Sequence, residues 1–274
     1  MAAMLDESKL TDAFQAFNTL SGALEASYRD LETQVARLNA ELAEARLERL
    51  RQERLATLGE MAARLAHDVR TPLSAALLYA SRLGLDGVSD EDRREIATRI
   101  VQRLKHLEGL VADMLAFARG GGGILARCDV SALLESAAQS LASRLDGRAR
   151  LTIRTLAPGV AVVGNAEALV GAIVNLATNA LDAAAGAAAP LVEIEASRAA
   201  GSAWIRVHDN GPGVPAAQRA RIFEPFYTTR PGGTGLGLAV VRAVALAHGG
   251  SVAIEDGPGG ATFALELPAV GEDA

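Results

Sequence analysis

The first part of the chain spaces its apolar residues as a helix does. Between residues 24 and 45 they step by four and three among charged residues, at Leu24, Tyr28, Leu31, Val35, Leu38, Leu42 and Ala45. This spacing is the heptad of a coiled coil. A solvated helix without a partner is the alternative, which a sustained apolar seam disfavours. The phase breaks within 46–54, so we expect an N-terminal coiled-coil segment over residues 1–54.

Residues 55–119 are predicted to form two amphipathic helices joined by a short turn. A new helical register starts at Leu58, and "DGVSDED" supplies Gly87 for a turn and Ser89 for the cap of the next helix. The second helix keeps its spacing until "RGGGG" at 119–123. A single hairpin cannot bury two apolar stripes, so we expect a homodimer that forms a four-helix bundle.

After a glycine-rich linker at 120–128, residues 129–270 alternate between strand and helix patterns. The strand-like segments are "ARLTIRTL", "PLVEIEASR", "AWIRVHDN" and a closing hairpin, "SVAIEDGPGGATFALELP". The helix-like segments are "DVSALLESAAQSLASRL", capped by Asp129 or Ser131, and "NAEALVGAIVNLATNALDAAAG". The fold class we predict is therefore α + α/β: a coiled coil and helical hairpin, followed by an α/β sandwich with helices over one face of a mixed sheet.

Composition narrows the function classes. The 274 residues carry a net charge of -6, which gives no reason to expect nucleic-acid binding. No run of about 18 apolar residues and no leader pattern is visible, so we expect no membrane span and a cytoplasmic protein. The single Cys128 excludes an internal disulfide and a metal site built from several cysteines.

Three segments carry candidate chemistry. Asn175 and Asn179 lie four apart on one helix face, and their amide oxygens suit Mg²⁺ when nucleotide phosphates balance the charge. Asp209 ends a predicted strand, where its carboxylate could accept an amino hydrogen from a base. The glycines of "GGTGLGL" precede a helix, whose free amides bind phosphate. Each segment alone has an ordinary structural explanation, but their order and spacing together point to a nucleotide site.

The motifs "HDVRTPL", "NLATN", "DNGPG", "FEPFYTTR" and "GTGLGL" resemble the H, N, G1, F and G2 boxes of sensor histidine kinases, in that order. The resemblance covers about residues 55–268. It implies a dimerisation and histidine-phosphotransfer hairpin followed by a Bergerat-type ATP-binding domain, ATP and Mg²⁺ as cofactors, and the receiver domain of a response regulator as partner. The segment "LGEMAARLAHDVRTPLSAALLYASRL" is more narrowly similar to kinases that control flagellar genes through enhancer-binding regulators.

The resemblance also implies roles for single residues. Asn179 would coordinate Mg²⁺, Asn175 would support it, and Asp209 would hold the adenine amino group. The residues expected to border the base are Gly211 and Gly213, and those expected to close over the phosphates are Gly233, Thr234, Gly235, Leu236 and Gly237. Arg230 would reach the terminal phosphate. One departure is Asp182, which stands where many relatives carry a basic residue, so that Arg230 is a candidate to supply the missing cation.

His67 is the expected phosphoacceptor. With Ala62 at heptad position a and Leu65 at d, His67 falls at f and points to solvent, with Asp68 and Thr71 beside it. We expect His67 to attack the γ-phosphate with the help of Asp68, and Thr71 to serve a phosphatase reaction. Pro72 lacks the amide that would bond the Asp68 carbonyl, which predicts a hinge beside the phosphoacceptor.

Two other functions compete with this interpretation. An ATPase of the gyrase, chaperone or mismatch-repair type shares the nucleotide fold, but those enzymes resemble one another in carrying a glutamate base where this chain has Asn175. A catalytically silent dimeric scaffold is the second alternative, which the intact motifs disfavour.

Overall fold

The computed structural model describes the backbone of residues 2–85, 88–142, 145, 149–230, 233–255 and 259–270. Side chains are described for these residues except 2–19, 21, 23, 26, 40, 43 and 47. The chain divides into two compact units, Met1–Gln52 and Glu53–Ala274. Helix α1 (Ala2–Glu60) is continuous, so the change of heptad phase within 46–54 does not interrupt it. Its predicted seam is exposed at Leu24, Leu31, Val35, Leu38 and Leu42.

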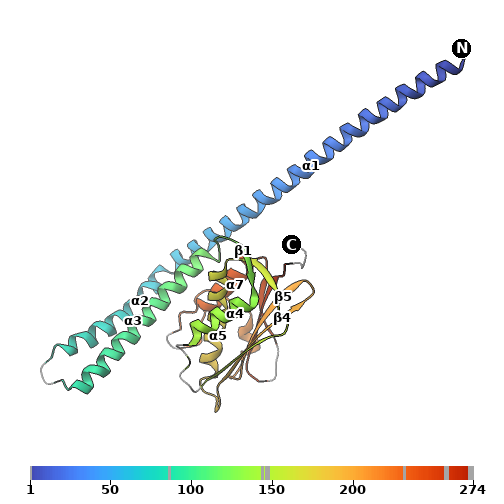
Figure 1. Ribbon diagram of the computed structural model, residues 1–274. Coiled ribbons are helices and arrows are strands. Elements are labelled where there is room, and N and C mark those ends of the chain that lie inside the picture. The colour runs from blue at the N-terminus through green and yellow to red at the C-terminus, as the bar shows by residue number, and fades with distance from the viewer. Residues whose placement is uncertain are drawn as a thin grey trace. The chain divides into compact units, whose positions relative to one another are not determined.

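Helices α2 (Ala62–Leu83) and α3 (Asp90–Arg119) lie side by side as a hairpin (Figure 1). The predicted cap is confirmed, because Ser89 Oγ accepts a hydrogen bond of 3.1 Å from the Asp92 amide. The predicted turn residue Gly87 lies outside the described residues. Apolar side chains on the outer faces remain exposed, namely Leu73, Leu77, Leu78, Val101, Leu104, Val111 and Leu115.

The helix that carries His67 is unbroken at Pro72. The Pro72 ring is buried within the hairpin, and α2 continues through it to Leu83. The interruption of the helix lies instead before His67, at Met61, whose φ of -99° and ψ of 12° depart from helical values. Proline removes only one intrahelical bond, so a helix held by tertiary packing can continue past it. A hinge at Pro72 stays a prediction.

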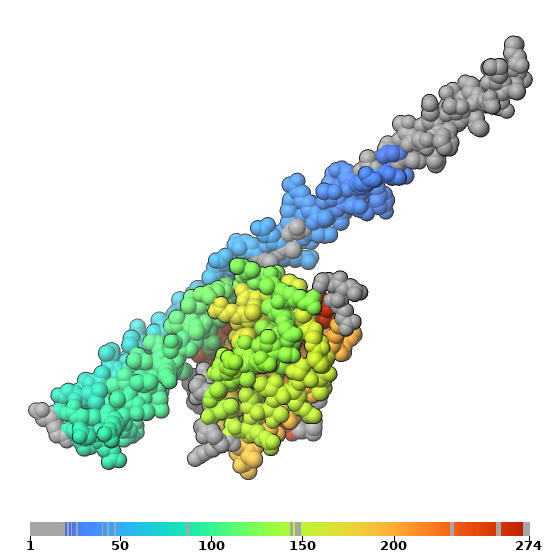
Figure 2. Space-filling model, viewed as in Figure 1, coloured from blue at the N-terminus to red at the C-terminus, as the bar shows by residue number. Residues whose placement is uncertain are grey.

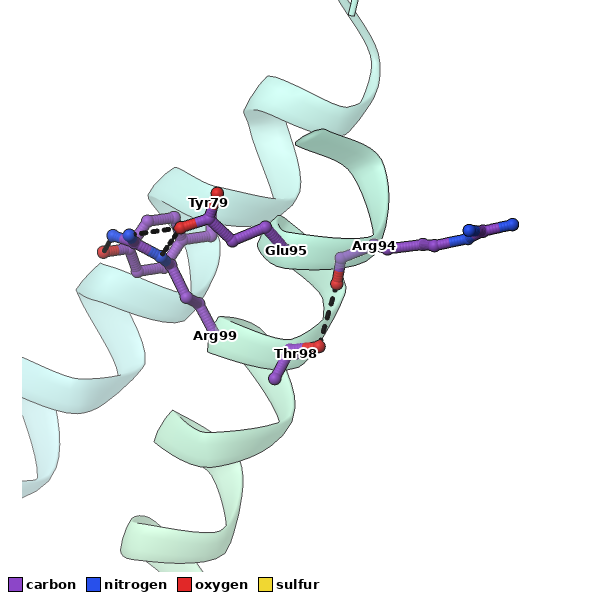
Figure 3. A network of polar contacts seen from close by, with 5 residues as sticks. All are labelled: Tyr79, Arg94, Glu95, Thr98 and Arg99. Carbon is purple, nitrogen blue, oxygen red and sulfur yellow. Dashed lines mark hydrogen bonds and ion pairs between the residues drawn. The ribbon is translucent and has the colours of Figure 1, made fainter. Parts of the chain in front are cut away.

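A polar network joins the two helices near their turn (Figure 3). The Arg99 guanidinium donates to the Tyr79 hydroxyl at 3.3 Å and lies 5.7 Å from the centre of its ring. Glu95 binds the same guanidinium from one turn earlier on α3. The hydrogen bond from Arg99 lowers the pKa of the Tyr79 hydroxyl. Arg99 therefore links α2 to α3 at the end of the hairpin distant from the linker.

The C-terminal domain is built on a five-stranded sheet in the order β2-β4-β5-β7-β6. Its strands are β2 (Arg150–Thr155), β4 (Leu191–Ala199), β5 (Ser202–Asp209), β7 (Thr262–Pro268) and β6 (Ser251–Glu255). The β2–β4 pair is parallel and the other pairs are antiparallel. A separate antiparallel pair, β1 (Ala126–Asp129) with β3 (Ala161–Gly164), was not predicted. Strand β1 begins inside the segment predicted to be a linker.

One face of the sheet is covered by α4 (Val130–Ala142), α5 (Ala166–Ala184) and α7 (Gly237–Ala247) (Figure 1). Along β5, the buried positions Ala203, Ile205 and Val207 alternate with partly exposed ones, as expected for a strand with one covered face. Helices α4 and α5, green to yellow-green, make much of the domain surface visible in Figure 2. A short helix α6 (Ala216–Arg219) follows β5. The predicted fold class is confirmed.

The glycine run after α3 is packed against its surroundings. A Cβ on Gly120 would overlap the Arg54 guanidinium, and one on Gly123 would lie 2.2 Å from Asn165 Nδ2. Gly121 has a φ of +78°, and its Cβ would lie 3.0 Å from Val244 Cα of α7. Burial lowers the pKa of Arg54. Positive φ at Gly120, Gly121 and Gly123, with the close approach of Gly121 to the Val244 backbone, explains why these three positions are glycine.

None of the described helices is both long enough and apolar enough to cross a membrane.

Candidate nucleotide-binding site

Most of the predicted nucleotide residues line one cavity of about 1180 Å³, whereas Gly211 and Leu236 do not line it. Its wall includes α5, the loop after β5, the segment before α7 and one side of α3. Of the predicted site residues, those that line it are Asn175, Asn179, Asp209, Gly213, Arg230, Gly233, Thr234, Gly235 and Gly237. Residues that are far apart in the sequence therefore meet in one place, as their order in the chain predicted.

Helix α5 presents both asparagines to this cavity. Asn165 caps the helix by accepting a bond of 3.0 Å from the Ala168 amide, and the core-facing side of the helix is buried through Leu169, Ile173 and Leu176. The Cβ that a side chain would add at Gly237 would stand 3.7 Å from Asn179 Nδ2 and 3.9 Å from Asn175 Cγ. Gly237 therefore lies beside both amides, at ordinary contact distance for an added Cβ.

Thr178 is a site residue that sequence reasoning missed. It lies between the two asparagines on α5 and lines the cavity. Within the described residues, its Oγ1 is the buried side-chain oxygen that has no hydrogen-bond partner. A buried hydroxyl without a partner is costly, which suggests that a ligand completes it.

Asp209 lies at the end of β5 and is only 1% exposed. Its Oδ1 accepts backbone bonds from Gly211 at 2.8 Å and Ala261 at 3.4 Å, which fixes the orientation of the carboxylate. A Cβ on Gly211 would lie 2.6 Å from the Ala183 carbonyl oxygen, and one on Gly213 would lie 2.8 Å from that of Gly260. These glycines are required by close packing beside a carboxylate that can still accept a bond through Oδ2.

The segment that leads into α7 is pinned at its base. The Phe226 amide donates to the Gly235 carbonyl at 2.9 Å, and both residues have positive φ, of 64° and 66°. Thr234 Oγ1 accepts from the Leu236 amide at 3.1 Å and donates to Asp113 of α3 at 3.3 Å. Leu236 is fully buried, so it anchors the segment and does not face the cavity. Gly232 lies outside the described residues.

Arg230 projects from this segment toward α5. Its guanidinium donates to Asp182 Oδ2 at 2.9 Å and to the Asn179 carbonyl at 2.7 Å. Both Asp182 and Arg230 line the cavity. Arg230, the cation expected to compensate for the missing basic residue, is therefore bonded to Asp182, the residue that stands at that position.

The predicted phosphoacceptor group lies apart from this cavity, on α2. His67 is exposed, as its heptad position predicted, and Thr71 Oγ1 donates to the His67 carbonyl at 3.0 Å. Asp68 lies 3.9 Å from Arg64. None of His67, Asp68 and Thr71 lines the cavity, whose helical hairpin wall comes from α3.

The donor groups fit a magnesium nucleotide. Among the described residues, no three His, Cys, Asp or Glu side chains gather around a possible metal position. A metal held by Asn179 would therefore need phosphate oxygens as its anionic ligands. The glycine-lined space, the fixed Asp209 carboxylate and the unpartnered Thr178 hydroxyl match a purine nucleotide.

Two protein families match successive parts of the chain. Residues 57–123 match the His Kinase A (phospho-acceptor) domain, and residues 164–271 match the Histidine kinase-, DNA gyrase B-, and HSP90-like ATPase family. The sensor protein kinase FleS of Pseudomonas aeruginosa is 39% identical over 266 residues, covering 97% of this chain and 63% of FleS. The C4-dicarboxylate transport sensor protein DctB of Rhizobium meliloti is 32% identical over 265 residues, covering 92% of this chain and 43% of DctB.

Solved structures give the same result. The histidine kinase ThkA, crystallised with the response regulator protein TrrA, is 25% identical with a TM-score of 0.69, over 84% of this chain and 67% of that one. Full-length ShkA in complex with AMPPNP is 32% identical with a TM-score of 0.57, over 77% of this chain and 46% of that one. The chain spans from less than half to somewhat under two thirds of the length of FleS and DctB. It belongs to the sensor histidine kinases of two-component systems.

Proposed function

We propose that this chain transfers the γ-phosphoryl group of ATP to His67 and then passes it to an aspartate of a response regulator. The observation that carries the proposal is the meeting of Asn175, Asn179 and Asp209 around one cavity, in a chain whose hairpin exposes His67. The AMPPNP complex of ShkA supports a nucleotide as the ligand, and the ThkA–TrrA complex supports a response regulator as the partner.

Nucleotide binding would use groups fixed by the fold. Asp209 Oδ2 would accept the adenine amino hydrogen, because Oδ1 already holds two backbone amides. Gly211 and Gly213 would let the backbone approach the base. Asn179, supported by Asn175, would hold Mg²⁺, which when bound neutralises phosphate charge. At the N-terminus of α7, the amides of Thr234, Gly235 and Gly237 would donate to the phosphates, because those of Gly233 and Leu236 already donate to the Arg230 carbonyl and to Thr234 Oγ1.

In the transfer step, an imidazole nitrogen of His67 forms a bond to the γ-phosphorus while the bond from that phosphorus to the β–γ bridging oxygen breaks. ADP leaves with the bridging oxygen. Asp68 would orient the ring or accept its proton. Because His67 does not line the cavity, transfer requires the nucleotide domain to move along the hairpin toward α2, or the cavity of one subunit to serve His67 of the other.

The second arrangement needs a homodimer, and the hairpin offers the surface for one. Leu77, Val101, Leu104 and Val111 are exposed at 43–63% although they belong to apolar helical stripes. A second copy would bury them in a four-helix bundle. The seam of α1 would extend the dimer as a coiled coil.

Two finer assignments rest on narrower support. Thr71, one turn after His67, would orient a water against the regulator's acyl phosphate in a phosphatase reaction. Similarity to FleS and the segment around His67 support a role in flagellar gene regulation. The competing ATPase function lacks a carboxylate at Asn175 to activate water, and a silent scaffold would not explain the open, glycine-lined cavity.

Substituting His67 by Gln tests the proposal. With ATP labelled at the γ-phosphate, wild-type protein should acquire acid-labile label and pass it to a receiver domain, whereas H67Q should acquire none and still bind Mg-ATP. Because His67 is exposed, the substitution should not disturb folding. Undiminished label on H67Q would refute the assignment.

A further inference from the structure

Arg230 forms a bridge between two elements of the nucleotide site. Its two terminal nitrogens bind different acceptors on α5, the Asp182 carboxylate at 2.9 Å and the Asn179 carbonyl at 2.7 Å. Its backbone is also held, because its amide donates to Thr228 Oγ1 at 3.1 Å and its carbonyl accepts from Gly233 at 3.2 Å. The guanidinium is therefore fixed beside the asparagine proposed to hold the metal.

Asp182 matters to the electrostatics of this end of the cavity. A carboxylate that lines the cavity would repel a polyphosphate, and Arg230 is the cation that the structure places against it. The side chains of Arg230 and Asp182 are 40% and 58% exposed, respectively, so the ion pair alone contributes little to the stability of the fold. Its effect would lie in orientation, because a long arginine side chain that is already ordered loses less freedom on binding an anion.

We propose that Asp182 is a positioning residue, which holds Arg230 so that the guanidinium binds the terminal phosphates of Mg-ATP. The role rests on the proposed function, since it requires the cavity to bind a nucleoside triphosphate. Arg230 has donors left for phosphate, because a guanidinium carries five N–H groups and the two bonds to α5 occupy only part of them.

A double-mutant cycle in Mg-ATP affinity tests this role. Loss of the ion pair in D182N should weaken binding by about threefold, in the range of exposed pairs. R230M removes a charge-assisted contact and leaves Asp182 facing the phosphates uncompensated, so it should weaken binding by about 30-fold. The double variant R230M/D182N should bind Mg-ATP no more weakly than R230M does. In that variant no arginine is left for residue 182 to position, and the repulsion between the Asp182 carboxylate and the phosphates is also removed.

Three further measurements separate positioning from a structural effect. D182E keeps a carboxylate and should recover most of the affinity that D182N loses. The effect of D182N should be larger for Mg-ATP than for Mg-ADP, which lacks the terminal phosphate. E95Q removes the partner of Arg99 from an ion pair of similar exposure near the turn of the hairpin, which does not line the cavity, and it should leave affinity unchanged. Thermal unfolding of each variant checks that it is folded.

Titration calorimetry of Mg-ATP binding to these variants tests whether Asp182 positions Arg230. A D182N affinity equal to that of the wild type, or effects of D182N and R230M that multiply in the double variant, would overturn the positioning role while leaving the proposed function intact. Failure of the wild-type protein to bind Mg-ATP would overturn both.

Discussion

Replacing Asp209 by Asn should invert the hydrogen-bonding character of the base-binding end of the cavity. In the structure, Oδ1 accepts the amides of Gly211 and Ala261, and the side chain is only 1% exposed. An asparagine would turn its carbonyl oxygen toward these two donors to keep them satisfied. Its NH₂ group would then occupy the place of Oδ2 and face the amino group of adenine, donor against donor.

D209N should lose the hydrogen bond between the adenine amino group and the Asp209 carboxylate. A hydrogen bond to a charged group contributes about 1.5–3 kcal/mol to binding. That loss corresponds to about a 10- to 150-fold weaker affinity for Mg-ATP. ITP carries a carbonyl oxygen where ATP carries the amino group, so the NH₂ group of D209N should favour it. The ratio of ATP to ITP affinity should therefore fall sharply, and it should pass below one if the amide is held as firmly as the carboxylate.

Competition against a fluorescent nucleotide gives both affinities under the same conditions. The ITP measurement is the internal control, because ITP shares the ribose and triphosphate of ATP and reports whether the rest of the site is intact. An ATP affinity within threefold of the wild type, or equal losses for ATP and ITP, would refute the role given to Asp209.

Two further predictions test other parts of the site and fold. T178V removes the Thr178 hydroxyl at nearly constant volume, so it should weaken Mg-ATP binding by about 2- to 12-fold, the value of one neutral hydrogen bond, while the protein stays folded; unchanged affinity would show that this hydroxyl does not meet the nucleotide. G121A and G159A are a matched pair, because both positions have φ near +79°, but an added Cβ approaches Val244 at Gly121 and meets nothing within 4 Å at Gly159. Urea unfolding should show G121A to be less stable than G159A by about 1–3 kcal/mol, the cost of overpacking, and equal stabilities would contradict the tight fit of the linker.

Much of the site could be predicted from sequence because its chemistry depends on local spacing. Asn175 and Asn179 share a face of any α-helix, and Asp209 ends a strand with clear alternation. The exposure of His67 followed from heptad phase alone. The fold class could also be predicted from local patterns, because the alternation of strand and helix patterns along the chain limits the possible architectures.

What could not be predicted depends on contacts between distant segments. Strands β1 and β3 are four residues each, too short for a recognisable period. The pairing of Arg230 with Asp182 joins residues 48 apart, and no local pattern specifies it. The unpartnered Thr178 hydroxyl depends on how α5 packs, whereas in an isolated helix a threonine commonly bonds the carbonyl one turn back.

The position of the phosphoryl group after incubation with Mg-ATP shows directly whether His67 is the phosphoacceptor. The 274-residue chain would be digested and its peptides sequenced by mass spectrometry at neutral to alkaline pH, which preserves phosphohistidine. We expect a phosphoryl group on His67 and none on the other three histidines, His106, His208 and His248. A phosphoryl group on another residue, or release of inorganic phosphate without any modification of the chain, would contradict this expectation.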